Sequence, residues 1–263
     1  MIRVLVAGAA GRMGSEVLRT VTAAEGMTVV AAVDPAHEHE EMDDGAGGCV
    51  ACLRDLSVAI AETEPDVMVD FTHPSVVADN LRIALSAGVD CVVGTTGLAD
   101  TTLRDVIARA PEGTCLFVAP NFAIGAVLMM HFAQQAARFM PAVEIVELHH
   151  DRKADAPSGT ALRTAALVNA ARSAVPATPG AETELPGAEG ARGACVEDIR
   201  IHSVRLPGLV AHQEVIFGGQ GQTLTIRHDS IDRTSFMPGV VLAIREVGSR
   251  SGLVMGLEQL LGV

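Results

Sequence analysis

The sequence predicts an α/β protein with a Rossmann-like, parallel-sheet nucleotide-binding domain and a smaller α+β domain. Three observations predict this fold. Apolar runs of strand length alternate with amphipathic helical segments over the first 122 residues, and a glycine-rich turn follows the first run. Later, three strand-like runs follow one another with no helix between them. Alternation is typical of a parallel sheet covered on both faces, whereas consecutive strands indicate a mixed or antiparallel sheet.

Composition narrows the class of protein. The chain has 263 residues, long enough for one large domain or two of ordinary size, and 49% of them are hydrophobic, enough for a well-buried core. No apolar run approaches the roughly 20 residues of a membrane span, and the N-terminus lacks a cleavable leader, so we expect a cytoplasmic protein with no membrane partner. The net charge of −13 and the absence of Tyr and Trp argue against nucleic acid.

The cysteines predict buried, reduced thiols, because five is an odd number and most lie in apolar, strand-like runs. "CVAC" at 49–52 has the CxxC spacing of redox or zinc sites. No second Cys/His pair stands at ligand spacing, so we expect no metal.

The first βαβ unit predicts a nucleotide site. An apolar strand at 2–8 leads into "GAAGRMG", a helix follows, and a second strand at 27–34 ends in Asp34. Gly8 allows the tight turn, Gly11 lets backbone N–H groups approach a pyrophosphate, and Gly14 lets the helix pack closely. Asp34 is placed to accept hydrogen bonds from an adenosine ribose. A turn that needs glycine only for geometry is the alternative, since GxxGxxG departs from the usual GxGxxG.

The alternation continues with strands at 65–72, 90–97 and 115–122 and helices at 74–88 and 98–111. Ligands of such sheets bind at the carboxyl ends of the strands. The polar residues expected at that edge are Thr72, His73, Gly94, Thr95, Thr96 and Asn121. Some of them could instead cap helices or shape turns.

The segment 35–54 is polar, acidic and glycine-rich, and we expect a mobile loop beside the ribose. It brings no arginine next to Asp34. His37, Glu38 and His39 have a spacing that could hold a metal, but a solvated loop is the simpler interpretation.

After residue 122 the pattern changes. Helices are expected at 124–140, 158–174 and 234–248, strands at 142–150, 198–206, 209–217 and 222–230, and a Pro/Gly/Glu-rich loop at 175–194. One face of this second sheet is apolar, so helices or another subunit must cover it.

The stretch "HHDRKADAPSGTA" (149–161) contains the only lysine, while the other eighteen basic residues are arginine. His149 and His150 are neighbours on a strand and should face opposite sides. Lys153 adds an ammonium, and Ser158 adds a hydroxyl beside the open N–H groups of the next helix. This set suits an anionic substrate that gains or loses a proton. An ordinary surface loop, with Ser158 as a helix cap, is the alternative.

This stretch resembles the substrate-site signature of the 4-hydroxy-tetrahydrodipicolinate reductase (dihydrodipicolinate reductase) family of diaminopimelate and lysine biosynthesis. "VAGAAGRMG", "DFTHP", "VVGTTG", "APNFAIGAV", "LVAHQEVIFG" and "DRTSFMPG" resemble the same family in the same order. The likeness spans essentially the whole chain, and only 35–54 does not align.

The resemblance implies reduction of a cyclic imine dicarboxylate by NADH or NADPH. It also implies a dinucleotide-binding domain made of 1–120 with 231–263, to which the last helix returns, and a substrate-binding and tetramerisation domain at 121–230. We therefore expect the helix at 234–248 to pack on the dinucleotide-binding domain, and the protein to be a homotetramer.

The resemblance also assigns site residues. The expected cofactor contacts are Gly8, Ala9, Ala10, Gly11, Arg12, Met13, Asp34, Gly94, Thr95, Thr96, Ala119, Pro120, Asn121 and Phe122. His149 and Lys153 match the catalytic pair, and the substrate contacts are His150, Ser158, Gly159 and Thr160. His149 is expected to protonate the substrate carbon, while Lys153 stabilises the anionic substrate and is a second candidate donor.

Two other functions are alternatives. A semialdehyde dehydrogenase would need a reactive cysteine in a loop between domains, and none of the five has that setting. A non-enzymatic dinucleotide sensor would not need the His–His–Lys cluster. For the cofactor, Asp34 should repel a 2′-phosphate and Arg12 could partly offset this, so we expect both cofactors to serve, with NADH at least equal.

Overall fold

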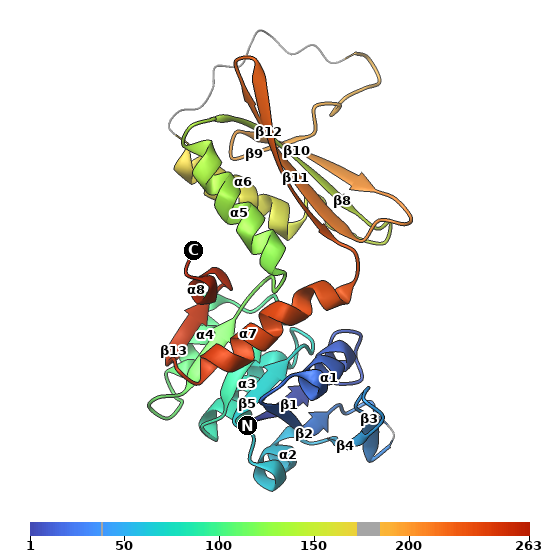
Figure 1. The fold of residues 1–263 in the computed structure, drawn as a ribbon, viewed down its shortest axis with the longest axis vertical. Helices are drawn as coiled ribbons and strands as arrows, with labels where there is room; N and C mark the ends of the chain where they lie inside the picture. The colour runs from blue at the N-terminus through green and yellow to red at the C-terminus, as the bar shows by residue number, and fades with distance from the viewer. Residues whose placement is uncertain (38, 173–184) are drawn as a thin grey trace. The chain divides into compact units, whose positions relative to one another are not determined.

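A computed structural model describes residues 1–37, 39–172 and 185–263 of the chain. These residues form two compact units. The first unit comprises Met1–Ile124 and Arg233–Val263, and the second comprises Gly125–Asp232. Figure 1 labels their helices and strands.

The first unit is built on an eight-stranded sheet with the order β13-β7-β6-β5-β1-β2-β4-β3. The strands are β1 (Ile2–Ala7), β2 (Met27–Val33), β3 (Glu41–Asp43), β4 (Cys49–Leu53), β5 (Val67–Asp70), β6 (Asp90–Val93), β7 (Cys115–Val118) and β13 (Gly252–Met255). All neighbours pair in parallel except β3 and β4, which are antiparallel. From β1 the chain continues to β2 on one side and later returns to β5 on the other. The carboxyl ends of β1 and β5 therefore flank the switch point where such sheets bind ligands.

Helices cover both faces of this sheet. One face carries α2 (Leu56–Thr63), α3 (Val77–Ser86) and α4 (Asp100–Ile107), whose apolar side chains pack with the strands in one buried core. On the other face α1 (Gly14–Ala23) packs with α7 (Met237–Val247), and α7 also contacts β6 and β7. The helix expected at 234–248 therefore packs within the first unit, preceded by a 3₁₀ turn, η1 (Arg233–Phe236), and followed by the short α8 (Glu258–Leu261).

The second unit is a five-stranded mixed sheet with the order β12-β11-β8-β10-β9. The strands are β8 (Ala142–His149), β9 (Ala194–Val196), β10 (Ile199–Arg205), β11 (Ala211–Gly219) and β12 (Gln222–Ser230). Only β8 and β10 pair in parallel. Helices α5 (Ile124–Ala137) and α6 (Gly159–Ala171) cover one face, and Ile145, Ile201 and Phe217 are buried there. Both sheets thus have the character that the sequence predicts.

The prediction of a loop over 35–54 is wrong for part of the segment. It contains β3 and β4, and β4 extends the large sheet by pairing with β2. The reason is a short alternation: Val50 and Cys52 are buried while Cys49 and Ala51 are exposed. Gly45 and Gly47 have positive φ in the turn that connects the two strands. Glu38, the middle residue of the His37–Glu38–His39 group whose spacing could hold a metal, lies outside the described residues, as does 175–184 of the expected loop at 175–194.

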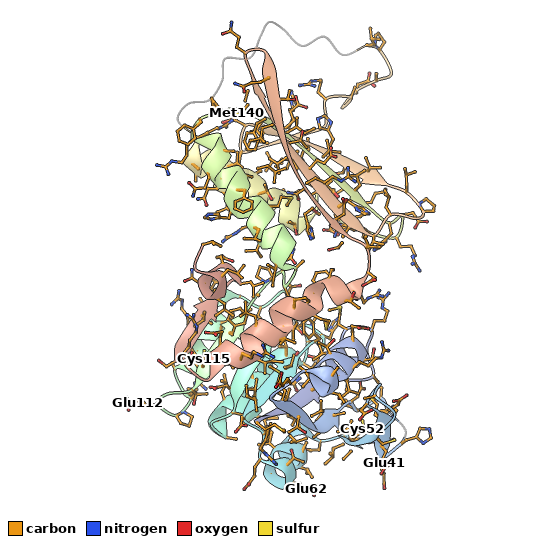
Figure 2. All side chains as sticks on the ribbon, viewed as in Figure 1. Glu41, Cys52, Glu62, Glu112, Cys115 and Met140 are labelled. Carbon is orange, nitrogen blue, oxygen red and sulfur yellow. The ribbon has the colours of Figure 1, made fainter. Side chains whose placement is uncertain are left out.

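The expectation of buried thiols is wrong for two cysteines. All five are free, but Cys49 and Cys195 are exposed. Cys195 lies on β9, an edge strand, and Cys49 is the first residue of β4, on the solvent-facing side of that strand. Cys52 on β4 and Cys115 on β7 are buried (Figure 2). Within the described ranges, no His, Cys, Asp or Glu side chains gather in threes as a metal would require. None of the helices described has both the length and the apolar character of a membrane span.

Candidate active site

The glycine turn at the end of β1 is shaped to receive an anion. Gly8 has φ +76°, and a Cβ at Gly14 would overlap the carbonyl oxygen of Gly8, so α1 starts directly against the turn. No side chain caps α1. In the described part of the chain, the N–H groups of Arg12, Met13 and Gly14 find no hydrogen-bond acceptor. Free N–H groups at a helix start bind phosphate well, so this turn fits the pyrophosphate of a dinucleotide.

Asp34 follows β2, and its carboxylate is hydrogen-bonded to the glycine turn that follows β1. Its Oδ2 accepts the Ala10 N–H at 3.0 Å, and its Oδ1 accepts the Ala36 N–H at 3.0 Å. A pocket of about 300 Å³ borders the turn, lined by Ala9, Ala10, Ser15, Leu18, Arg19, His37, Met42 and Asp43. Asp34 is therefore close to the pocket, as a ribose ligand would require.

Arg19 brings a cation into this pocket that sequence inspection missed. Sequence inspection considered Arg12 in the glycine turn and the segment after Asp34, whereas Arg19 comes from α1. Its guanidinium forms an ion pair with Glu16 at 2.8 Å. The only signal in the sequence was its position on the helix that follows the glycine turn.

A buried carboxylate organises the opposite side of the switch point. Asp70 at the end of β5 is fully buried, and it accepts hydrogen bonds from the Thr72 N–H, the Thr72 hydroxyl, Asn80 Nδ2 and Thr95 Oγ1 at 2.7–3.0 Å. It thereby joins two of the predicted edge residues, Thr72 and Thr95. Sequence inspection did not single out Asp70, whose only signal was its place at the end of an apolar strand.

Of the other predicted edge residues, His73 follows β5, and Gly94, Thr96 and Asn121 lie in the loops that follow β6 and β7. A Cβ at Gly94 would overlap the ring of Phe71, which packs on Phe122 with ring centroids 5.7 Å apart. Thr96 and Pro120 are exposed, while the Ala119 N–H bonds to the Val93 oxygen.

Two of these residues also make the local bonds that sequence inspection allowed as an alternative. Asn121 Oδ1 accepts the Ala123 N–H, and His73 Nδ1 lies 2.9 Å from Ser75 Oγ at the turn before α3.

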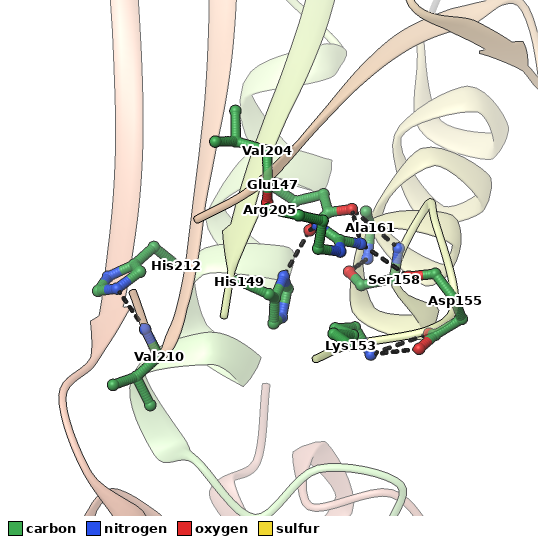
Figure 3. A network of polar contacts seen from close by, with 10 residues as sticks. All are labelled: Glu147, His149, Lys153, Asp155, Ser158, Ala161, Val204, Arg205, Val210 and His212. Carbon is green, nitrogen blue, oxygen red and sulfur yellow. Dashed lines mark hydrogen bonds and ion pairs between the residues drawn. The ribbon is translucent and has the colours of Figure 1, made fainter. Parts of the chain in front are cut away.

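In the second unit, a hydrogen-bond network starts at His149 (Figure 3). Alternate side chains of a strand face the same side, so Glu147 and His149 are neighbours on β8. His149 Nδ1 lies 2.5 Å from Oε2 of Glu147, whose side chain is 0% exposed. Arg205, at the end of β10, donates to both oxygens of Glu147 at 2.8 and 2.7 Å. The Ser158 N–H also donates to Glu147, at 3.2 Å.

The same network holds the loop that carries the lysine. Arg205 Nη2 donates to the backbone oxygen of Asp155 at 2.7 Å. Lys153 Nζ donates to both carboxylate oxygens of Asp155, and its side chain is 22% exposed. Ser158 Oγ accepts the Ala161 N–H as the N-cap of α6. Glu147, Arg205 and Asp155 were all missed by sequence inspection, although Glu147 stands two residues before His149 in the same motif.

The remaining predicted residues lie at the same loop and helix start. Gly159 and Thr160 form the first turn of α6, and a Cβ at Gly159 would meet nothing within 4 Å. His150 follows His149 at the end of β8, and its Nδ1 is buried with no hydrogen-bond partner in the part of the chain described. A buried ring nitrogen without a partner is costly unless a ligand supplies one.

The surroundings set the charge of this network. Burial would raise the pKa of Glu147, but hydrogen bonds from Arg205, Ser203 and His149 hold it below its usual range. For His149, burial lowers the pKa. The hydrogen bond and charge of Glu147 oppose that effect, while the charges of Lys153 and Arg205 add to it. The network therefore holds an ionised carboxylate beside a histidine that releases its proton readily.

The buried cysteines lack the environment of a nucleophile. Burial raises the pKa of Cys52 and Cys91, and it raises the pKa of Cys115 to about 11. Nucleophilic cysteines have a lowered pKa, so these three do not suit the cysteine chemistry of a semialdehyde dehydrogenase.

Comparison with known proteins identifies the family of this chain. Residues 2–122 match the family model "Dihydrodipicolinate reductase, N-terminus", and residues 125–261 match "Dihydrodipicolinate reductase, C-terminus". The 4-hydroxy-tetrahydrodipicolinate reductase of Mycobacterium sp. (strain KMS) is 54% identical, with 99% of each chain covered. That of Syntrophomonas wolfei is 50% identical, with 98% of each chain covered.

Solved structures agree with these matches. A dipicolinate-bound dihydrodipicolinate reductase from Paenisporosarcina sp. TG-14 has a TM-score of 0.85 and 44% identity, covering 98% of this chain and 99% of that one. An amine dehydrogenase from Mycobacterium smegmatis, 14% identical with a TM-score of 0.65 over 96% of this chain and 94% of its own, shares the fold alone.

Proposed function

Because this chain belongs to the dihydrodipicolinate reductase family, it is an oxidoreductase of diaminopimelate and lysine biosynthesis, and we propose that residues 149–160 form its substrate site. The reaction reduces 4-hydroxy-tetrahydrodipicolinate to tetrahydrodipicolinate with a nicotinamide cofactor. One observation carries the proposal: a single hydrogen-bond network, centred on the buried Glu147, joins His149, the loop of Lys153 and the start of α6.

The first unit, whose bounds differ by a few residues from the expected 1–120 with 231–263, is our candidate for the dinucleotide-binding domain. The free N–H groups of Arg12, Met13 and Gly14 would hold the pyrophosphate, and Asp34 would bind the adenosine ribose. The loops at 94–96 and 119–122 would flank the nicotinamide half. When bound, the reduced nicotinamide supplies the hydride.

For cofactor choice, we propose that the enzyme uses both NADH and NADPH, with a kcat/KM for NADH at least equal to that for NADPH. Asp34 supports NADH because a carboxylate binds free ribose hydroxyls and repels a 2′-phosphate. Arg12, and Arg19 in the adjacent pocket, support a residual use of NADPH, because a guanidinium pairs well with phosphate.

The second unit, whose bounds differ by a few residues from the expected 121–230, is our candidate for the substrate domain. The N–H groups of Gly159 and Thr160 and the hydroxyl of Ser158 stand at a helix start, where a carboxylate binds favourably. The unpartnered Nδ1 of His150 supports a second polar contact. Lys153 would neutralise the anionic substrate, and His149 would donate a proton to its carbon.

Coupled kinetics test this assignment. The preceding synthase makes the substrate in situ, and the loss of NADH absorbance reports turnover. We expect His149→Gln and Lys153→Met to lower kcat/KM by about two decades, the scale of general acid catalysis, while NADH affinity stays unchanged. Near-normal turnover in both variants would show that the substrate is bound and protonated elsewhere.

We also propose that the enzyme is a homotetramer assembled through the second unit. Large apolar side chains of this unit are exposed, notably Phe132, Phe139, Leu206 and Leu224. Burial of such side chains between subunits would be favourable. Light scattering on the purified chain measures the mass directly. We propose a cytoplasmic location because the reaction needs reduced nicotinamide, and cell fractionation tests that location.

A further inference from the structure

The buried carboxylate of Glu147 accepts hydrogen bonds from several donors, and one of them is the proposed proton donor. His149 Nδ1 lies 2.5 Å from Oε2, while Arg205 donates to both oxygens and the Ser158 N–H donates to Oε1. We propose that Glu147 is a positioning residue that holds the proton of neutral His149 on Nδ1, so that Nε2 is the nitrogen that delivers the proton to substrate. This inference rests on the proposed role of His149.

Hydrogen-bond chemistry gives the assignment. An ionised carboxylate only accepts, so the ring nitrogen facing it must carry a hydrogen. Neutral His149 then has its proton on Nδ1 and a lone pair on Nε2. The protonated ring carries a second proton on Nε2. On transfer, the Nε2–H bond breaks and its electron pair stays on nitrogen. The electron pair of the substrate carbon forms the new C–H bond.

Arg205 explains why Glu147 does not take the proton itself. Its guanidinium contacts both carboxylate oxygens, and a paired, hydrogen-bonded carboxylate stays ionised. Arg205 also holds the Asp155 backbone oxygen, and Glu147 holds the Ser158 N–H. The ion pair therefore fixes the His149 ring in the same frame as the lysine loop and the start of α6.

The charged groups that face His149 determine its response to pH. They are Glu147 on its own strand, Arg205 on β10 and Lys153 in the loop, which is itself paired with Asp155. Of these, Glu147 raises the pKa of His149, whereas Lys153 and Arg205 lower it. Removing the Glu147 charge should therefore lower the pKa of His149 further. A proton donor with a lower pKa is protonated only at lower pH, so the descending limb of kcat/KM should move to lower pH.

Nitrogen NMR of the wild-type chain tests the tautomer without any variant that must fold. Ring ¹⁵N shifts are measured above the pKa of His149, and the signals are assigned by their loss in His149→Gln. We expect a protonated Nδ1 and an unprotonated Nε2. The opposite tautomer, or a mixture of the two, would overturn the proposal.

Kinetics test whether the arrangement matters. Glu147→Gln should lower kcat by about 10- to 100-fold, with a smaller change in KM. The descending limb of its kcat/KM profile should move to lower pH. Glu144→Gln is the matched control, because Glu144 lies on the same strand and also pairs with one arginine and one histidine, Arg192 and His202. It should keep kcat within about twofold of wild type. Equal kcat and equal pH limbs in the two variants would overturn the proposal.

A double-mutant cycle shows whether Glu147 acts through His149. In the His149→Gln background, adding Glu147→Gln should lower kcat by less than about twofold, because coupled residues are not additive. An undiminished effect in that background would overturn the inference. If His149→Gln alone retains wild-type kcat, the proton-donor role fails and the inference fails with it. NMR would still report the tautomer of His149. It therefore distinguishes a failure of the proton-donor role from a failure of the His149–Glu147 hydrogen bond.

Discussion

The ammonium of Lys153 lies on the carboxylate of Asp155, with Nζ 2.7 Å from Oδ1 and 2.9 Å from Oδ2. Asp155 is mostly exposed, and its pKa is lowered chiefly by the hydrogen bond from Lys153. An exposed pair of this kind contributes little to stability, about 0–1 kcal/mol. A substrate carboxylate can therefore replace Asp155 as the partner of the ammonium at small cost.

This geometry predicts that arginine cannot replace Lys153. A guanidinium keeps the charge but is larger, planar and always protonated. We expect Lys153→Arg to lose about as much kcat/KM as Lys153→Met, roughly 3 kcal/mol or two decades, with NADH binding and folding unchanged. Coupled kinetics and NADH titration measure both. Retention of more than about a third of wild-type activity in Lys153→Arg would show that only the charge matters.

Cofactor choice is the second prediction. We expect kcat/KM with NADH to equal or exceed that with NADPH, because Asp34 faces the glycine turn. Arg19→Ala should lower kcat/KM for NADPH by about three- to tenfold and leave NADH nearly unchanged, because only NADPH offers a phosphate to that guanidinium. A preference for NADPH above about tenfold in the wild type, roughly 1.4 kcal/mol, would contradict the role given to Asp34.

The glycine turn supplies the third prediction. A Cβ at Gly14 would overlap the Gly8 oxygen, so Gly14→Ala must move the turn away from α1. We expect a loss of about 1–3 kcal/mol in stability and at least about tenfold in NADH affinity. Gly248→Ala is the control, since its Cβ would lie 3.7 Å from Asp90 Oδ2 and its φ is −68°. Calorimetry and NADH titration should separate the two variants, and equal affinities would argue against the turn as the pyrophosphate site.

Acid stability is the fourth prediction. The pKa of Glu147 is lower in the folded chain than its unfolded value of about 4.3, so the ionised carboxylate favours folding. That contribution is complete above the unfolded pKa and disappears as the pH falls through the folded pKa. At neutral pH, Glu147→Gln leaves Arg205 without its charged partner, and we expect a cost of about 3–5 kcal/mol. Urea unfolding should show this difference shrinking as the pH drops below about 4. A constant difference would mean that the pair is not the cause.

Local motifs made much of this molecule predictable. The βαβ unit, the mixed second sheet and the segment from His149 to Thr160 are encoded by neighbouring residues, because strand alternation, turn glycines and helix caps act over short distances.

The residues that sequence inspection missed depend on tertiary pairing. Arg205 meets Glu147 only because β10 lies beside β8, and Thr95 meets Asp70 only because β6 lies beside β5. The hairpin of β3 and β4 was also missed, since its three- and five-residue strands are fixed by pairing with each other and with β2.

The most direct test of the account is single-turnover kinetics on the double variant His149→Gln/Lys153→Met, with NADH bound and the substrate made in situ. The account predicts wild-type NADH affinity together with hydride transfer slowed by at least about two decades, because the dinucleotide binds through the first unit while the substrate is held and protonated by the second. Hydride transfer at the wild-type rate in a variant that binds NADH normally would contradict it.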